Sequence, residues 1–133
     1  QNLSIGNPAY AQLVLKAWKD FDSKNFENSL SMFADDVVAT FPDGTAVKGK
    51  DNLFKMAKDF QGKYSSMTSD IHACTTLKSA ESPGTEVAII WGVSTATKTD
   101  GSIEKTNLHE VWYFNKDGKV TALYQYAAAV PKE

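Results

Sequence analysis

The sequence predicts an α+β domain in which helices pack on one face of a curved, mostly antiparallel sheet. Two observations support this fold class. The first half of the chain contains three segments with apolar residues at helical spacing, and the second half contains alternating segments separated by turn residues. With 133 residues, 42% of them hydrophobic, the chain is long enough for one core. We therefore expect residues 1–133 to form a single domain.

The N-terminal half predicts three helices and a β-hairpin. Asn7 and Pro8 suit the N-cap and the first position of a helix, which then presents a regular apolar face. A short second helix is expected over residues 26–34. A third helix should run from Asp51 to about Gln61 and end at Gly62. Between the second and third helices, residues 37–41 and 45–47 predict two short strands around the turn residues Pro42, Asp43 and Gly44.

The C-terminal half predicts four antiparallel strands. The first spans residues 68–79, and three more span 87–97, 103–114 and 120–129. Asp100-Gly101 and Asp117-Gly118 separate the last three, and Asp-Gly between alternating runs is a strong hairpin signal. If Asp100-Gly101 is a two-residue turn, Trp91 lies opposite Glu110. Alternation then gives one strongly apolar face, with these members: Val87, Ile89, Trp91, Val93, Leu108, Glu110, Trp112 and Phe114.

Glu110 is the one carboxylate on this apolar face and therefore the first candidate for function. Surrounded by Trp91, Trp112 and Leu123, its carboxyl would have a raised pKa, which suits an acid or base or a hydrogen-bond donor to a ligand carbonyl. Two other interpretations remain open. A hydroxyl, lysine or water could satisfy the carboxylate, or a different register could place it in solvent. Burial without any partner would cost several kcal/mol.

The remaining polar candidates are weaker. His109 is adjacent to Glu110 but on the opposite face, so we expect a surface or interface position. His72 and Asp70 share one side of a strand and form either a catalytic dyad or a surface pair. No pair of histidines has metal-ligand spacing with a carboxylate, so no metal or cofactor is predicted. The lone Cys74 is interpreted as a small strand residue.

The opposite face of the predicted sheet is also apolar, which points to an interface. A contiguous patch of this kind is rarely left to water, and aromatic residues are enriched in interfaces. We therefore expect a homodimer through the sheets. The residues predicted to form it are Ile90, Val111, Tyr113, Val120, Tyr124 and Tyr126.

Composition argues against two classes of partner. The net charge is −2 and all fourteen basic residues are lysines, whereas arginine is the usual residue for phosphate and base-edge recognition. Nucleic-acid binding is therefore not expected. No apolar run approaches the length of a membrane span, so a membrane role is not expected either. The chain starts at Gln1, which leaves a cytoplasmic protein and an exported protein with a cleaved signal peptide both open.

The order of elements, together with four short phrases, resembles the NTF2-like superfamily in its SnoaL-like branch. The phrases are residues 32–37 (MFADDV), 41–44 (FPDG), 49–51 (GKD) and 114–120 (FNKDGKV), and the resemblance runs from about Tyr10 to Ala128. It implies a cone: a bent sheet around helices, with an apolar pocket open at one end and dimers that often form through the outer face. The superfamily includes ketosteroid isomerases, polyketide cyclases, epoxide hydrolases, dehydratases and non-enzymatic binding or transport proteins, so the fold alone implies no single activity.

The resemblance also allows the catalytic positions to be compared one by one. The isomerase general base, an aspartate before the turn proline, corresponds to Phe41, and the isomerase tyrosine falls near Ala17. The acid on the penultimate strand corresponds to Glu110. An aspartate on the last strand of epoxide hydrolase-like members corresponds to Gln125. Only one of the three isomerase positions keeps an ionisable group, so isomerase chemistry by the usual route is not expected.

These observations predict a dimeric protein that binds a small apolar molecule bearing a carbonyl or hydroxyl group. Phe41, Trp91 and Trp112 would form the walls of the pocket, with Glu110 and Gln125 as polar anchors. A first alternative is an enzyme of the same fold, a cyclase, dehydratase or isomerase, that uses Glu110 as acid or base. A second is a non-catalytic assembly domain whose pocket is filled by its own side chains.

Overall fold

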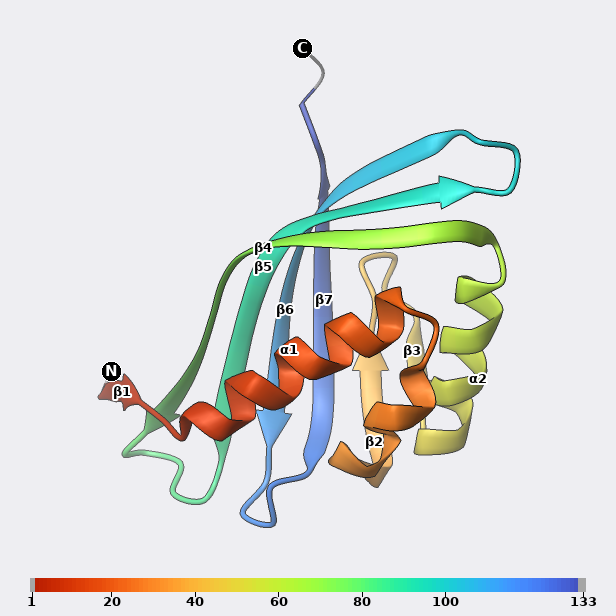
Figure 1. The fold of residues 1–133 in the computed structure, drawn as a ribbon. Coiled ribbons are helices and arrows are strands. Elements are labelled where there is room, and N and C mark those ends of the chain that lie inside the picture. The colour runs from red at the N-terminus through yellow and green to blue at the C-terminus, as the bar shows by residue number, and fades with distance from the viewer. Residues whose placement is uncertain (1, 132–133) are drawn as a thin grey trace.

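The computed structural model describes residues 2–131, which form one mixed sheet and three helical segments (Figure 1). In chain order these are β1 Leu3–Ile5, α1 Pro8–Asp22, the 3-10 helix η1 Phe26–Met32, β2 Phe33–Thr40, β3 Ala46–Lys48, α2 Lys50–Gln61, β4 Tyr64–Ser79, β5 Glu86–Lys98, β6 Ile103–Phe114 and β7 Val120–Ala129.

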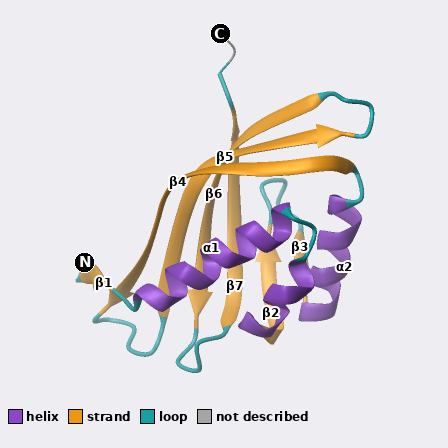
Figure 2. Cartoon of the chain, in the orientation of Figure 1, coloured by secondary structure: helices purple, strands orange, loops and turns teal. Residues whose placement is uncertain are grey.

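The strand order in the sheet is β1-β4-β5-β6-β7-β2-β3. All neighbouring strands are antiparallel except β2 and β7, which run parallel. The helices lie together on one side of the sheet, and the long strands bend over them (Figure 2). This arrangement confirms the predicted α+β fold with a curved, mostly antiparallel sheet.

The bend in the long strands has a local cause in β4 and β5. The pairing of β4 with β5 is irregular between Ile71 and Ala73, where an extra residue is accommodated. Such bulges bend a strand and increase its twist. Opposite the bulge, a Cβ added at Gly92 would collide with the carbonyl oxygen of Asp70 and lie 2.9 Å from the Ile71 Cα. The close approach of the two backbones therefore requires glycine at this position.

The register between β5 and β6 differs from the prediction by one residue. The loop has three residues: Lys98 accepts a hydrogen bond from the Gly101 amide at 2.9 Å and donates one to the Ser102 carbonyl at 2.8 Å. Gly101 adopts φ +90°, as expected for a three-residue hairpin with a left-handed last residue. The predicted two-residue turn was therefore wrong. Ile90, not Trp91, lies opposite Glu110.

This shift exchanges the faces of the β5 residues. Ile90 is fully buried on the inner face, so its predicted place on the outer face is wrong. Trp91 is 42% exposed on the outer face beside His109, so its predicted place as an inner wall is also wrong. Val120 was also predicted outside, but it is buried beside Phe114 because the β6–β7 pairing is irregular after Tyr113.

Smaller differences concern element ends. The second helix is a 3-10 helix that ends at Met32, because β2 already begins at Phe33 and continues past an irregularity before Val38. β4 begins at Tyr64, four residues earlier than predicted, and β1 was not predicted. The first helix begins as predicted, with the Asn7 side chain accepting a hydrogen bond from the Ala9 amide at 3.0 Å.

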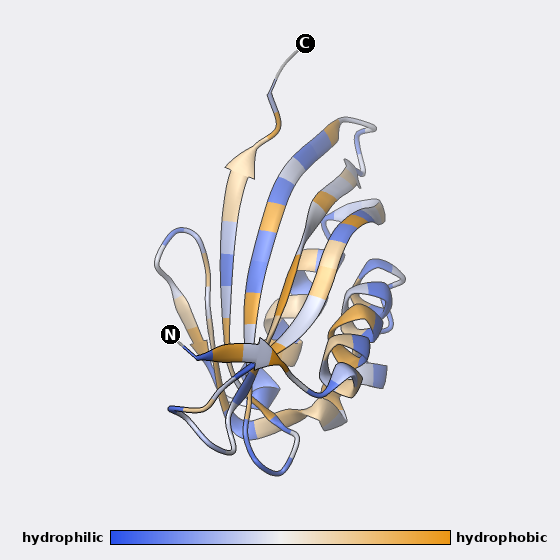
Figure 3. Ribbon diagram, turned by 90° about the vertical axis from the view of Figure 1, so that its left-hand side faces the viewer, coloured by the Kyte–Doolittle hydropathy of each residue, from blue (hydrophilic) through white to orange (hydrophobic). Residues whose placement is uncertain are grey.

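Hydrophobic and hydrophilic residues alternate along the strands, as the bands in Figure 3 show. The inner residues pack against α1 at one end of the sheet. There Tyr10 stacks on Phe114 with ring centroids 4.4 Å apart, and the Ala11 amide donates to the Thr76 hydroxyl at 3.0 Å. Val14, Val37 and Val120 are completely buried. This packing anchors the first turns of α1, while the later turns face a cavity.

Candidate functional site

A cavity of about 620 Å³ lies between the concave face of the sheet, the end of α1, α2 and the β2–β3 hairpin. Its size is within the range of ordinary small-molecule sites. Aromatic side chains dominate its wall: Trp18, Phe21, Phe26, Phe41, Phe60, Tyr64 and Trp112. A large apolar hollow lined by rings can accept a compact hydrophobic molecule.

Glu110 on β6 lines this cavity and is 5% exposed. Its Oε1 accepts hydrogen bonds from the Trp18 indole N–H at 2.7 Å and from the Trp112 indole N–H at 3.0 Å. Its Oε2 accepts one from the Gln125 amide at 2.7 Å. The predicted inward position of Glu110 is therefore correct, although its partners are two indoles and an amide rather than a hydroxyl, lysine or water.

All three hydrogen-bond donors to this carboxyl are neutral, and the coulombic effect of His109 on its pKa is the smallest of those acting on it. Desolvation raises the pKa of Glu110, and the hydrogen bonds from Gln125, Trp18 and Trp112 only partly counteract it. Indole N–H groups can only donate, so Oε1 stays an acceptor in either protonation state. A proton on Glu110 therefore belongs on Oε2, next to the amide of Gln125, whose orientation can reverse to accept it.

A second polar group lies at the C-terminal end of α1. Asp22 lines the cavity, and burial raises its pKa while a hydrogen bond with the Ser69 side chain lowers it. Nearby on the wall, the Tyr64 hydroxyl donates to Glu104 Oε2 at 3.0 Å, and Lys98 forms an ion pair with Glu104 Oε1 at 2.8 Å. Glu104 is therefore paired with a lysine, whereas the hydrogen-bond partner of Asp22 is the neutral hydroxyl of Ser69.

Of the five predicted ligand-binding residues, four line the cavity: Phe41, Glu110, Trp112 and Gln125. Trp91 does not. Ala17 lines the cavity without a hydroxyl, and Phe41 occupies the place of the isomerase base, so neither offers a proton-transfer group.

Two cavity residues were missed as functional candidates. They are Trp18 and Asp22, both on α1. Their spacing of four residues puts both on one side of α1, but periodicity alone does not say that this side faces a cavity.

The other titratable candidates lie outside this cavity. His72 Nε2 and Asp70 Oδ2 are 3.7 Å apart, both side chains are exposed, and neither residue lines the cavity. His109 lies on the outer face between Trp91 and Tyr126, with ring centroids at 5.9 and 6.1 Å. The Cys74 thiol contacts the Ala11 carbonyl, and burial raises its pKa to about 11, so the thiol is not an activated nucleophile.

Residues 2–131 contain no group of three or more histidine, cysteine or carboxylate side chains arranged to hold a metal ion. In the same range, no helix has the length and apolar character that a membrane crossing requires.

Comparison with known proteins places this cavity in a familiar fold. The family model for the SnoaL-like domain matches residues 14–123. None of the curated proteins compared matches the chain. An NTF2-like protein of unknown function from Exiguobacterium sp. 255-15 is 16% identical with a TM-score of 0.70, over 89% of this chain and 99% of that one.

Two further solved structures carry names that refer to activities. An LEH-like epoxide hydrolase of M. tuberculosis is 14% identical with a TM-score of 0.71, over 91% of this chain and 84% of that one. A protein from Shewanella denitrificans OS-217, assigned to the SnoaL-like polyketide cyclases, is 11% identical with a TM-score of 0.74, over 92% of each chain. Identities this low show the fold alone. Because the family model spans most of the chain, the chain belongs to the SnoaL-like domain family, and its fold is that of the NTF2-like structures.

Proposed function

We propose that the cavity binds a small apolar molecule whose carbonyl or hydroxyl group contacts Glu110 and Gln125. The observation that carries this proposal is the asymmetry of the Glu110 carboxyl. Both indole donors bind Oε1, so Oε2 and the Gln125 amide form a separate polar pair at the cavity wall. A hollow with apolar walls and a few convergent polar groups is the usual form of a small-molecule site.

The pair offers both kinds of hydrogen bond. A protonated Oε2 would donate to a ligand carbonyl, and the Gln125 amide would donate to or accept from a ligand hydroxyl. The raised pKa of Glu110 favours the protonated state. Because Trp18 and Trp112 fix Oε1, the carboxyl does not need to reorient when a ligand binds. Such preorganisation reduces the entropic cost of binding.

The test is a titration with 2-tetralone, 2-tetralol and the purely apolar tetralin, followed by NMR. The indole N–H signals of Trp18 and Trp112 and the side-chain amide of Gln125 report on the site directly. We expect the ketone and alcohol to shift these signals and to bind about tenfold more tightly than tetralin. Gln125→Leu should remove this preference, and Asp70→Asn on the outer face should not.

Two results would count against the proposal. One is an absence of shifts in both indole signals at millimolar probe. The other is equal affinity for tetralin and for the two polar probes, because the polar pair would then contribute nothing.

A catalytic version of the same site has one observation in its favour. A carboxylic acid with a raised pKa at the wall of a cavity suits a general acid that protonates a carbonyl or epoxide oxygen. Glu110→Gln would then abolish turnover of an epoxide or ketone substrate while binding is retained. If the variant keeps full turnover, the acid is not Glu110.

For assembly, we propose that a second copy of the chain covers the outer face of β5, β6 and β7. Val111 lies at the centre of this face, between Ile89 and Tyr124 in the sheet register. Tyr113 packs edge-to-face on Tyr124 at 5.9 Å, and Tyr124 and Tyr126 are 39% and 55% exposed. An apolar, aromatic surface of this kind favours association.

A further inference from the structure

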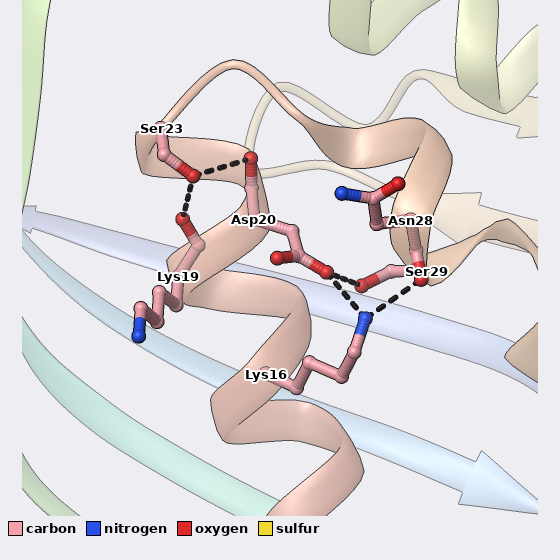
Figure 4. A network of polar contacts seen from close by, with 6 residues as sticks. All are labelled: Lys16, Lys19, Asp20, Ser23, Asn28 and Ser29. Carbon is pink, nitrogen blue, oxygen red and sulfur yellow. Dashed lines mark hydrogen bonds and ion pairs between the residues drawn. The ribbon is translucent and has the colours of Figure 1, made fainter.

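The carboxylate of Asp22 differs in its partners from the other acids on α1 and around the cavity. Two residues earlier, Asp20 accepts from Lys16 Nζ at 2.6 Å and from the Ser29 hydroxyl at 2.7 Å (Figure 4). Asp22 lies on the cavity side of the same helix and is half-buried. No lysine or histidine within residues 2–131 lies within ion-pair distance of it. Its neighbour is the Ser69 side chain.

Among the residues that the structure describes, acidic side chains line the cavity and basic ones do not. Four carboxyl side chains line it, and none of the lysines or histidines that the structure describes does so. Asp43 is occupied by the amide and hydroxyl of Thr45 at 2.9 and 2.7 Å, and Glu104 by Lys98. Glu110 is occupied by its indole and amide donors. Of these four acids, Asp22 is thus the one whose carboxylate has neither a paired cation nor more than one hydrogen-bond donor among the described residues.

Aromatic rings line the same cavity as Asp22. Phe21 and Phe60 have ring centroids 5.8 Å apart, and Phe60 and Tyr64 are 5.0 Å apart. All three residues line the cavity. The faces of such rings attract a cation, and the attraction grows when the site excludes water. Carboxylate and ring faces together match the chemistry of an ammonium group.

We propose that Asp22 and the rings of Phe21, Phe60 and Tyr64 bind an ammonium group, so that the natural ligand is an apolar amine. This inference depends on the proposed function, since it assigns the second polar group of the same ligand. Trp18, whose indole binds Glu110, lies one helical turn before Asp22 on α1. A ligand with a compact apolar skeleton between Glu110 and Asp22 would place its carbonyl or hydroxyl group at Glu110 and its ammonium group at Asp22.

Three probes with one ring system and different charge test this directly: 2-aminotetralin, 2-tetralol and tetralin-2-carboxylate. Dissociation constants are measured by calorimetry near neutral pH. We expect the amine to bind at least about tenfold more tightly than the alcohol, and the carboxylate at least about tenfold more weakly. Because the comparison uses the unmodified protein, it does not depend on whether any variant folds.

Matched variants then assign the effect to Asp22. Asp22→Asn should reduce affinity for the amine about tenfold and leave that for the alcohol unchanged, and Asp22→Glu should retain the preference. Asp70→Asn removes the same charge from the outer face and should change neither affinity, which separates a local ion pair from the net charge of the protein. Thermal melts confirm that each variant is folded.

The possible failures are distinguishable. If the alcohol binds as tightly as the amine, the ammonium site is overturned while the proposed function survives. If Asp22→Asn binds the amine as the unmodified protein does, Asp22 is not the anion that selects it. If none of the probes binds at millimolar concentration, both proposals are overturned.

Discussion

The two faces of β6 place two titratable side chains next to each other in opposite environments. Glu110 points inward, is 5% exposed, and receives three hydrogen bonds from neutral donors. His109 points outward and lies among the exposed rings of Trp91 and Tyr126. The buried carboxyl of Glu110 needs protein donors to offset its desolvation, whereas on the outer face water can satisfy the imidazole.

This difference shows that the two faces respond to different forces. The inner face of the sheet contacts helix α1: Trp18 donates a hydrogen bond to Glu110, and Asp22 lines the same cavity. On the outer face, the aromatic side chains contact their cross-strand neighbours, and this is the face that we propose a second copy covers. Substitutions on the inner face should therefore change folding stability, and those on the outer face should change association.

The largest expected effect on stability comes from Glu110→Leu. The side chain keeps its approximate volume, but the indole N–H groups of Trp18 and Trp112 lose their acceptor in a buried site. Each unsatisfied buried donor costs about 1–3 kcal/mol, so we expect a loss of roughly 2–6 kcal/mol in the free energy of unfolding. Urea denaturation near neutral pH measures it.

Two further variants serve as controls for this prediction. His109→Leu, one residue away on the outer face, should change stability by less than about 0.5 kcal/mol. Glu110→Gln retains an acceptor for both indoles, so its stability should equal or exceed that of the unmodified protein. A similar loss for Leu and Gln would show that the hydrogen bonds to the indoles are not what stabilises this site.

The largest expected effect on association comes from Val111→Lys, at the centre of the outer face. A buried lysine without a partner opposes the proposed dimer, and we expect its dissociation constant to rise about 100-fold or more. Sedimentation velocity measures the change, and Lys105→Glu, farther along the same face of β6, serves as a charge control. If the unmodified chain sediments as a monomer at tens of micromolar, the proposed interface is wrong.

An intermediate effect is expected at the bend that separates the packed end of the sheet from the cavity. Gly92→Ala places a methyl group against the Asp70 carbonyl, and relief requires movement of backbone. Overpacking of this kind costs about 1–3 kcal/mol. Gly62→Ala is the matched control, because Gly62 has φ −65° and its nearest Cβ contact is 3.5 Å. It should be neutral or slightly stabilising in the same urea titration.

Much of the fold was predictable because local signals agreed with one another. Three boundaries were predicted correctly because each depends on local backbone conformation alone. They are the helix start at Asn7-Pro8, the helix end at Gly62 and the turn at Asp117-Gly118. The inward position of Glu110 was correct because alternation along β6 does not depend on its partner strand. The β5 register was wrong because one extra loop residue reverses every side chain of that strand.

The site was predictable only in part, for a different reason. Trp112 and Gln125 lie on β6 and β7, Phe41 directly follows β2, and all three line the cavity as predicted. Trp18 and Asp22 lie on a helix whose orientation over the sheet is set by tertiary packing, which local periodicity does not contain. The donors to Glu110 therefore could not be named from the sequence, although the need for some partner could.

The smallest expected effect concerns the pH dependence of stability, and it separates the two faces of β6 once more. Burial raises the pKa of Glu110 above its unfolded value, so the folded protein retains this proton more strongly. The associated stability is fully present below the unfolded pKa and is lost as pH rises through the folded pKa. Glu110→Gln has no such proton, so its stability relative to the unmodified protein should increase as the pH rises above the unfolded pKa of about 4. Subtracting the two urea titrations at each pH cancels the contributions of all other carboxylates. A relative stability that instead decreases over this range would mean that the three donors outweigh desolvation, and that Glu110 is a buried anion.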